Sequence, residues 1–493
     1  MSRSDKGPAP VPRPGKRQAG ARGWAFLLVV ALAGVLYGHR LDAVRAPVWD
    51  ESYYLTAEAR LHLGRVQFAS HPPLGIMLIA AGDAASGLND GIDWGVLARD
   101  KSVAGEAVPV GFDWRGHRLA AALCGALAAG LFYLLICGIV GSSGAALMVC
   151  ALFLCDTALI VQFSTAQLDA FQIVFVLAAL LCAQRGFASE GTRQRIWATG
   201  FGAALMLAAM VRLNALMLAP AGLWLLAGRG PGAVTQPGFW GMRREYEALR
   251  RGLLIAAMAL GAVLAAAWVL AAMLALSPHG PDLASAAGRV DAGFVSRDYA
   301  AGHVLPALGA YARDYARFIA ADLAGVPLLD PNASHPWHWL VGSGATTYRW
   351  DAWGERVAVL GFVPNRAAWL ISLAGVAATL LQALCTRGRA LLREPMTVLL
   401  LTGWLLNMAA LLWLDQGRAM YAYHYLIPLI LGHALAASAW RRAGCSERLA
   451  WPALALVLGW CLATLPLATH RGVSQDYCRR FLPSCGEAIS RTS

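Results

Sequence analysis

The stretch RLAAALCGALAAGLFYLLICGIV, residues 118–140, decides the fold class of this chain. Beyond Arg118 it contains no charged side chain, so a helix formed by it would be apolar on every side. Such a helix is buried in a large core or in a membrane, and about 20 residues are enough to cross the hydrocarbon layer. The stretch therefore predicts a membrane-spanning helix.

The rest of the chain repeats this pattern. Of its 493 residues, 58% are hydrophobic and 14% are charged, whereas soluble proteins carry about 25% charged residues. We predict an all-α polytopic membrane protein with about eleven transmembrane helices. The predicted spans lie near residues 24–38, 118–140, 144–162, 166–184, 196–211, 213–228, 253–276, 366–384, 396–414, 419–440 and 449–468.

The basic residues indicate how the chain is threaded. The net charge is +12, but Lys and Arg gather in short loops between apolar runs, which the positive-inside rule assigns to the cytoplasm. No basic stripe with interleaved aromatics suits a nucleic-acid backbone. We therefore expect membrane lipids and no nucleic acid as partners. The run 24–38 is interpreted as a retained first span and not as a cleaved signal peptide.

This threading divides the chain into membrane modules and external segments. Two long segments fall outside, and both contain amphipathic stretches typical of helices that lie along a membrane surface. Disulfides persist outside the cytoplasm, so Cys478 and Cys485 of the external tail are predicted to be bridged. The expected divisions are a disordered basic cytoplasmic tail (1–23), an N-terminal membrane module (24–276) with its first external loop (39–117), a second external loop (277–365), C-terminal membrane helices (366–468) and an external C-terminal tail (469–493).

An acid pair, Asp50 and Glu51, follows the first span in the segment PVWDESYYL, residues 47–55. Adjacent residues of a helix point in different directions, so the two carboxylates are expected to have different roles. One can face a reacting group while the other holds the local backbone. The alternative is a capped helix start, with Asp50 at the N-cap and Glu51 in the first turn.

The order of motifs from this pair onward resembles one family. His71-Pro72-Pro73 and an apolar helix follow the acid pair in the same loop. This order resembles the protein O-mannosyltransferases of glycosyltransferase family 39, which have the GT-C membrane fold. Four later segments are similar to motifs of that family, in the same order along the chain: FDWRGHRLAAALCGAL (112–127), DTALIVQFSTAQLDAF (156–171), HPWHWLVG (335–342) and GRAMYAYHYLIPLIL (417–431).

Three departures from the family pattern are visible. Ser164 stands where the family usually has an Arg, and Arg212 replaces a Lys of the fifth span. The chain also has no room for the inserted β-trefoil repeat domain of fungal and animal members. The resemblance is therefore to a bacterial branch, located in the cytoplasmic (inner) membrane with its active site on the outer face and its N-terminus in the cytoplasm.

The resemblance implies a polyprenyl-phosphate sugar, mannose by default, as donor. Its leaving phosphate gains negative charge, which fixed cations can stabilise, and an arginine fork can bind phosphate oxygens bidentately. Candidate phosphate-binding residues are Arg118, Arg212, Arg418 and His424. Interfacial anchoring is the alternative for Arg118 and Arg212, and interfacial packing is the alternative for His424.

The acceptor implied by the resemblance is a Ser or Thr hydroxyl of a secreted polypeptide. Asp50 is the candidate general base of an inverting displacement, and Glu51 is expected to orient the loop or bind substrate. The other expected substrate-binding residues are His71, Asp156, Asp169, His335, Trp337 and Trp339. Interfacial polar residues and belt aromatics are the alternatives for the two aspartates and the two tryptophans.

No cofactor or metal is expected. Asp50, Glu51 and His71 could supply ligands to a divalent ion, but a hard cation usually requires more oxygen ligands than this loop concentrates. Two further functions stay open at this point. One is transfer of the sugar to lipid A, another lipid or a polysaccharide. The other is transport, which is disfavoured because the two halves show no convincing internal repeat.

Overall fold

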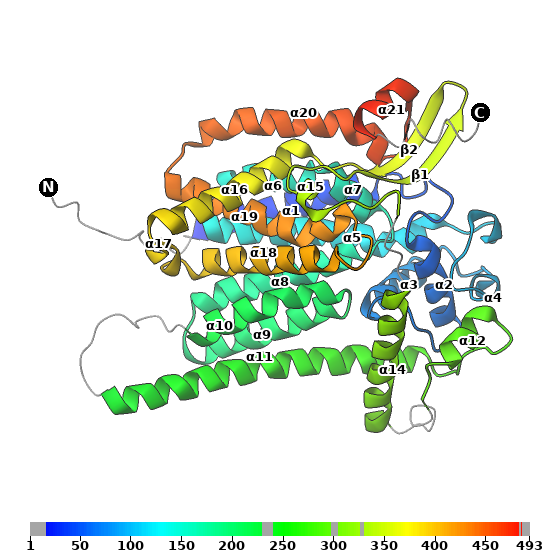
Figure 1. Ribbon diagram of the computed structural model, residues 1–493, viewed down its shortest axis with the longest axis horizontal. Coiled ribbons are helices and arrows are strands. Elements are labelled where there is room, and N and C mark those ends of the chain that lie inside the picture. Colours follow the sequence, from blue (N-terminus) through cyan, green and yellow to red (C-terminus); the bar gives the residue numbers. More distant parts are fainter. Residues whose placement is uncertain (1–15, 229–239, 297–303, 326–329, 483–484, 486–493) are drawn as a thin grey trace.

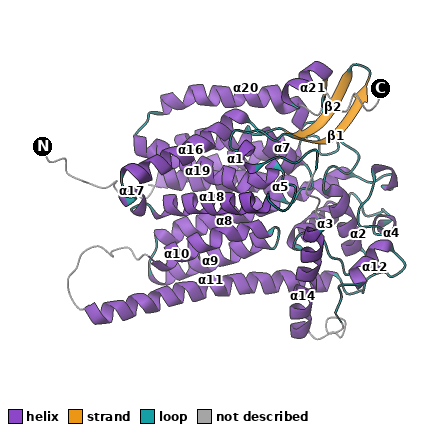
Figure 2. Cartoon of the chain, in the orientation of Figure 1, coloured by secondary structure: helices purple, strands orange, loops and turns teal. Residues whose placement is uncertain are grey.

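The computed structural model describes residues 16–228, 240–296, 304–325, 330–482 and 485. Long helices run along the longest axis of the molecule, and strands lie at one end of it (Figures 1 and 2). Within the described residues, seven helices are long and apolar enough to span a membrane, or eight if the bent pair α6–α7 is one span. The helical, multi-pass fold is confirmed. A total of eleven spans is not reached by this criterion and stays a prediction.

The membrane bundle is built from two sets of helices. The N-terminal set comprises α1 (Lys16–Gly38), α5 (Trp114–Val140), α6 (Ser143–Leu154), α7 (Thr157–Ser164), α8 (Asp169–Phe187), α9 (Gly191–Ala209), η2 (Leu213–Leu218), α10 (Ala219–Gly228) and α11 (Trp240–Leu276). The C-terminal set comprises α16 (Arg366–Cys385), α17 (Arg389–Leu392), α18 (Pro395–Leu414), η3 (Ala422–Tyr425), α19 (Leu426–Ala443), η4 (Glu447–Leu449) and α20 (Ala450–Ala468).

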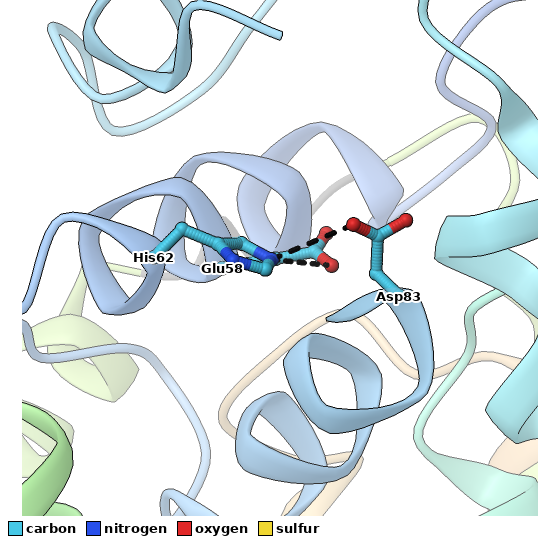
Figure 3. Close-up of side chains that lie close together, drawn as sticks. All are labelled: Glu58, His62 and Asp83. Atoms are coloured by element: carbon cyan, nitrogen blue, oxygen red, sulfur yellow. Dashed lines mark ion pairs between the residues drawn. The ribbon is translucent and has the colours of Figure 1, made fainter. Parts of the chain in front are cut away.

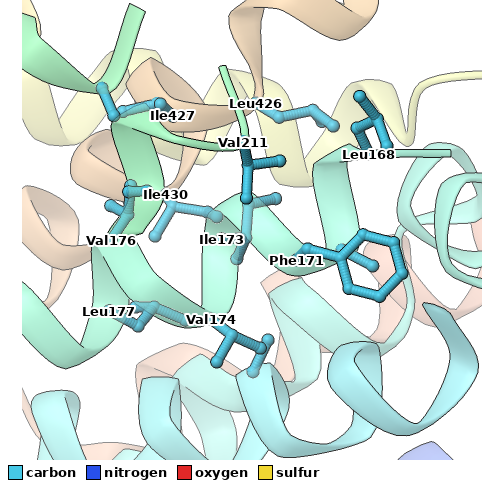
Figure 4. Packing of buried hydrophobic residues seen from close by; sticks show 14 of the residues in the cluster. Leu168, Phe171, Ile173, Val174, Val176, Leu177, Val211, Leu426, Ile427 and Ile430 are labelled. Atoms are coloured by element: carbon cyan, nitrogen blue, oxygen red, sulfur yellow. The ribbon is translucent and has the colours of Figure 1, made fainter. Parts of the chain in front are cut away.

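The two sets share one apolar core. Ile173 and Val176 of α8 lie near Ile427 and Ile430 of α19 in the packed interior shown in Figure 4. Helices α16 and α19 approach so closely at Gly375 that a Cβ at this residue would collide with the backbone of Ala436. Small residues at such contacts let membrane helices pack backbone to backbone.

The remaining elements gather at one end of the bundle (Figure 1). Helix α14 runs across the direction of the bundle helices, as expected for an amphipathic helix outside the membrane core. These elements are α2 (Glu51–His62), α3 (Leu74–Ser86), α4 (Trp94–Leu97), η1 (Gly105–Ala107), α12 (Ala286–Ala292), α14 (Val304–Ala324), α15 (Pro336–Trp339), β1 (Thr346–Trp353), β2 (Arg356–Phe362), β3 (Gly472–Ser474) and α21 (Gln475–Phe481).

A small antiparallel sheet, in the order β1-β2-β3, was not predicted. Strands β1 and β2 form a hairpin in which Trp353 pairs with Arg356. Gly354, with φ +59°, takes the first position of the two-residue turn, where a positive φ is required. Strand β3, from the predicted external tail, pairs with β2. In the same tail Cys478 and Cys485 form the predicted disulfide.

Three predicted segments differ from the helices of the structure. Residues 1–15 of the predicted tail lie outside the described residues, but residues 16–23 are helical and belong to α1. Helix α11 begins at Trp240, well before the predicted start at 253. The predicted span 144–162 is broken between α6 and α7 by a bend of 69°. The Asp156 carboxylate accepts from Ala158 N at 3.1 Å, so it caps a new helix at this point.

Candidate active site

The loop before α2 fixes where the acid pair points. Trp49 adopts φ +52°, a conformation that costs energy for a bulky residue and persists only where surrounding contacts enforce it. Asp50 occupies the N-cap of α2, but its side chain makes no capping hydrogen bond. The capping interpretation of Asp50 is therefore wrong, and its carboxylate is available for other contacts.

Glu51 and Arg118 form a buried clasp. The guanidinium donates Nε to Oε1 at 2.8 Å and Nη2 to Oε2 at 2.7 Å. The same carboxylate accepts from the backbone N–H groups of Val48 at 3.0 Å and Ala166 at 2.8 Å. Burial is the largest single influence and would raise the pKa of Glu51, but the charge and hydrogen bonds of Arg118, the charge of His117 and the Ala166 N–H together outweigh burial and lower the pKa below its ordinary value.

Every N–H of Arg118 is already used. Besides its bonds to Glu51, Nη1 donates to the carbonyls of Leu41 at 2.8 Å and Val44 at 2.7 Å, and Nη2 donates to that of Ala46 at 3.0 Å. A guanidinium has five N–H donors, so none is left for a phosphate. The prediction that Arg118 binds the donor phosphate is corrected: Arg118 holds the first external loop against α2 and α5.

Asp50 has a sparser environment. Its Oδ2 accepts from Tyr54 Oη at 3.3 Å and lies 4.0 Å from Nη2 of Arg212, and its side chain is 28% exposed. Desolvation raises the pKa of Asp50, and the charges of Arg212 and Arg418 only partly offset this rise. A partly exposed carboxylate with a raised pKa and a cation beside it can serve as a general base.

Arg212 joins Asp50 to a second buried carboxylate. Its Nη1 donates to Asp169 Oδ1 at 3.3 Å, and Asp169 Oδ2 accepts from Gln162 Nε2 at 3.1 Å. Gln162 Oε1 in turn accepts from Tyr348 Oη at 3.3 Å. Within the described part of the chain, the buried Nε of Arg212 and the buried Nε of Arg418 have no hydrogen-bond partner. Unlike Arg118, these two arginines keep donors for an anion.

Aromatic rings surround the backbone at Asp50. The Trp49 ring stacks on Tyr348 of β1 with centroids 5.1 Å apart. It meets the rings of Tyr421 and Tyr423 edge-on at 5.3 and 6.4 Å. Segments from the first external loop, the hairpin and η3 therefore converge on one site.

Comparison with known proteins finds a family similarity in the N-terminal part of the chain. Residues 26–227 match the family described as dolichyl-phosphate-mannose-protein mannosyltransferase. The matched range includes Asp50, Glu51 and Arg118, and it also includes Asp169 and Arg212. Arg418, His424 and the hairpin lie beyond it.

Two curated relatives are Protein O-mannosyl-transferase 1 of Mus musculus and of Danio rerio. Each is 33% identical, over 169 and 158 residues respectively. The alignments cover 33% and 32% of this chain and 22% and 21% of the relatives, so the match spans about a fifth of their length.

A solved structure shows the fold over nearly the whole chain. A chain of the S. cerevisiae protein O-mannosyltransferase Pmt1-Pmt2 complex, bound to the sugar donor, matches with a TM-score of 0.70 at 13% identity. The match covers 93% of this chain and 92% of that chain. The GT-C fold expected from the sequence is confirmed.

Two other predicted site residues, His71 and His424, lie near side chains of the Asp50 site. The His71 ring is 6.4 Å from the Tyr54 ring, and the His71 carbonyl accepts from Tyr315 Oη at 2.8 Å. The His424 ring lies 4.5 Å from Tyr423, whose ring faces the Arg212 guanidinium at 5.4 Å. Substrate contact by these residues stays a prediction.

Other predicted site residues have contacts that serve the fold. Asp156 is fully buried, and its carboxylate also accepts from Asn365 N at 3.1 Å and Trp369 Nε1 at 2.7 Å, which ties α7 to α16. Trp339 is fully buried and donates to Ser334 Oγ at 2.9 Å. These partners account for both residues without a substrate.

His335 and Trp337 lie at the surface. The side chain of His335 is 71% exposed and its Nδ1 pairs with Asp415 at 2.8 Å. Trp337 is 61% exposed. Within the described chain, neither residue contacts Asp50, so their role as substrate contacts rests on the family motif alone.

Sequence reasoning missed four side chains of the site, namely Tyr54, Gln162, Tyr348 and Tyr423. Tyr54 sits one helical turn after Asp50, and this spacing predicts contact on one helix face. Tyr423 lies within a segment that resembles a family motif. Gln162 and Tyr348 gave no such signal, because their contact is made only by the fold.

The acid pair is poorly suited to hold a metal ion. Each oxygen of Glu51 already accepts two hydrogen bonds, one from Arg118 and one from a backbone N–H. A ligand oxygen needs a free lone pair, which leaves Asp50 and His71 as too small a set for a hard cation.

Proposed function

We propose that the protein transfers a sugar, mannose most simply, from a polyprenyl-phosphate donor to Ser or Thr hydroxyls of secreted polypeptides. The proposal places it in a bacterial inner membrane with the site on the outer face. The family match of residues 26–227 and the likeness of the fold to the yeast Pmt1-Pmt2 chain, solved with its sugar donor, support it. The observation that carries it is the Asp50 carboxylate, which makes no capping hydrogen bond, is partly exposed and lies beside Arg212.

In the proposed reaction the acceptor hydroxyl attacks the anomeric carbon of the sugar. A new C–O bond forms while the C–O bond to phosphate breaks, and its electron pair leaves with the polyprenyl phosphate. The hydroxyl proton passes to Asp50 Oδ2. A single displacement of this kind inverts the anomeric configuration. Proton transfer to a positioned carboxylate contributes about 10²–10⁴-fold to such reactions.

Arg212 and Arg418 are proposed to stabilise the leaving phosphate. The phosphodiester of the donor becomes a monoester and gains negative charge as the glycosidic bond breaks. The unpartnered Nε groups of both arginines lie among buried side chains, where donors fixed in advance stabilise developing charge more strongly than in water. Arg212 is held in place by Asp169 and Tyr54.

Glu51 is proposed to position the site and not to react, because its oxygens are saturated by Arg118 and by backbone donors. We propose that the reaction itself needs no cofactor, since Arg212 and Arg418 supply the positive charge that a metal ion would otherwise provide. Polyprenyl-phosphate sugar, a polypeptide acceptor and surrounding lipid are then sufficient partners.

The aromatic side chains of Trp49, Tyr348, Tyr421 and Tyr423 are proposed to line the binding site for the sugar or the acceptor. Stacked and edge-on rings present apolar faces suited to sugar C–H groups and a peptide backbone. An acceptor other than polypeptide is the second candidate function, since nothing in these contacts is specific to an amide backbone.

The test is an in vitro transfer assay with the purified chain, labelled polyprenyl-phosphate mannose and two acceptors, a Ser/Thr-rich peptide and lipid A. Label is expected in the peptide, with the stereochemistry inverted. Label in lipid A alone would replace the polypeptide acceptor by a lipid. Label in neither, together with donor movement across vesicles, would support transport and overturn the proposal.

A further inference from the structure

Three titratable side chains converge at the far end of α2 from Asp50. Glu58 and His62 lie one turn apart on α2, and Asp83 of α3 faces them (Figure 3). His62 Nε2 lies 3.7 Å from Glu58 Oε1 and 3.6 Å from Asp83 Oδ2. All three ligand atoms lie within 4.8 Å of one another.

The atoms that face each other are unsatisfied. Glu58 is fully buried and Asp83 is 2% exposed. In the described structure, the buried Glu58 Oε1 and His62 Nε2 have no hydrogen-bond partner. Separations of 3.6–3.7 Å exceed hydrogen-bond lengths of about 2.7–3.2 Å. A buried carboxylate oxygen without a partner carries a large desolvation cost, so it points to a missing ligand.

The second oxygen of each carboxylate and the ring of His62 have contacts of their own. Glu58 Oε2 is 2.5 Å from His117 Nδ1, and Asp83 Oδ1 accepts from Asn89 Nδ2 at 2.6 Å. The His62 ring stacks on Trp94 with centroids 4.0 Å apart. Such outer contacts orient the ligands of metal sites and fix which atom faces the ion.

We propose that Glu58, His62 and Asp83 bind a divalent zinc ion that joins α2 to α3. One imidazole and two carboxylates are a ligand set that Zn²⁺ uses, with water in the fourth position. Bonds of about 2.0–2.1 Å in a tetrahedron place ligand atoms about 3.3 Å apart. The two separations from His62, 3.6 and 3.7 Å, need only a small contraction to reach this geometry, and the Glu58 and Asp83 oxygens, which lie within 4.8 Å of each other, would also move together around the ion.

The site is structural and separate from the proposed reaction. Asp50 is the N-cap of α2, whereas His62 is its last residue. An ion at the C-terminal end would fix α2 against α3 and so hold the orientation of the helix that begins at the acid pair. No group of the Asp50 site is a ligand.

Zinc content and zinc-dependent stability test the proposal. The purified chain is stripped with chelator and re-equilibrated with zinc, and bound metal is measured by elemental analysis alongside thermal unfolding. The variants are His62→Gln and Asp83→Asn, which keep polar side chains. The matched control is Asp90→Asn, an exposed acid beyond the end of α3. Wild type and control are expected to hold about one zinc per chain and to gain a few degrees in Tm with zinc.

Both ligand variants are expected to lose the bound zinc and the zinc-dependent rise in Tm. Their Tm values without zinc separate a folding defect from a binding defect. If wild type binds no more zinc than Asp83→Asn, the proposal is overturned. It is equally overturned if both ligand variants shift Tm by the same amount with and without zinc, because the cluster is then an ion-pair network only.

Discussion

At the scale of single residues, the two neighbouring acids differ because their surroundings differ. Glu51 is saturated by five-donor Arg118 and by two backbone groups, and this makes it a fixed anion. Asp50 accepts one long hydrogen bond from Tyr54 and faces Arg212. Only Asp50 can accept a proton without dismantling the fold around it.

Asp50→Asn separates a base from a structural group. Asparagine keeps the size and the contact with Tyr54 but cannot take a proton, so turnover should fall about 10²–10⁴-fold with donor binding unchanged. The measurement is steady-state transfer beside a donor-binding assay. Asp42→Asn, an exposed acid of the same loop, is the control and should match wild type. Near-normal turnover of the Asp50 variant would remove it from the mechanism.

The pH dependence of turnover reports the same group. A base must be ionised, so the rate should fall as the pH drops through the pKa of Asp50. Desolvation raises this pKa, and the acid limb should therefore lie above the ordinary aspartate value of about 3.9. Arg212→Met removes a charge that lowers the pKa of Asp50, so the limb should move to higher pH. A limb that does not move with this variant belongs to another group.

The sequence was informative about these residues to different degrees. The acid pair and Asp169 could be found because they lie in segments that resemble family motifs, and Arg212 because it stands where the family usually has a Lys. The roles of Arg118 and Arg212 could not be separated, because both are arginines near predicted helix ends. Only the contacts show that one has all its donors occupied and the other has donors left.

At the scale of elements, the Glu51–Arg118 clasp holds three segments together. Arg118 from α5 contacts the carbonyls of Leu41, Val44 and Ala46, while Glu51 begins α2. The loop that precedes the acid pair is also fixed by buried Val48 and by the packing of Trp49 on Tyr348, but the buried pair is the charged contact that ties the loop to both α2 and α5. The position of Asp50 therefore depends in part on this buried pair.

Arg118→Ala should destabilise the chain. Removing one partner of a buried ion pair leaves the other charge uncompensated and costs about 3–5 kcal/mol. Thermal unfolding in detergent measures this loss. Arg115→Ala, in an exposed pair with Asp113, is the control and should leave the stability nearly unchanged. Combining Arg118→Ala with Glu51→Gln should recover part of the loss. Unchanged stability with weaker donor binding would restore the phosphate-binding role.

Helix prediction succeeded where the apolar run alone defines the element. The predicted spans 366–384 and 396–414 agree with α16 and α18 to within one residue. The break between α6 and α7 was missed because apolar runs flank Asp156 on both sides, and the contact of its carboxylate with Asn365 N joins distant parts of the chain. The sheet was missed because its third strand has only 3 residues and comes from a distant part of the chain.

At the scale of the whole molecule, Asp291 of α12 binds the two external segments together. Its carboxylate accepts from Phe68 N at 3.1 Å and Lys101 Nζ at 2.5 Å, and it lies 3.5 Å from Arg60 Nε. Asp291 is fully buried. One acid from residues 277–365 thus forms ion pairs with two cations from residues 39–117.

Asp291→Asn should loosen this connection. Buried Arg60 and partly exposed Lys101 would lose their shared counterion, at a cost of about 3–5 kcal/mol. The expected readouts are a lower Tm and faster proteolysis within the external segments, with the membrane helices still protected. Asp282→Asn, in a partly exposed pair with Arg65, should change stability by about 1 kcal/mol or less. Equal effects of the two variants would show that the connection does not depend on Asp291.

The pairing of β3 with β2 has a consequence for biosynthesis. A ribosome delivers β2 early and β3 only after α16, α18, α19 and α20 have been made. Until then the edge of β2 at Val357 and Ala358 has unpaired N–H and C=O groups, and such an edge can pair with a strand of another chain. A nascent chain that stops before residue 472 would therefore expose a strand edge that a chaperone can bind. In the finished chain β3 covers this edge of β2.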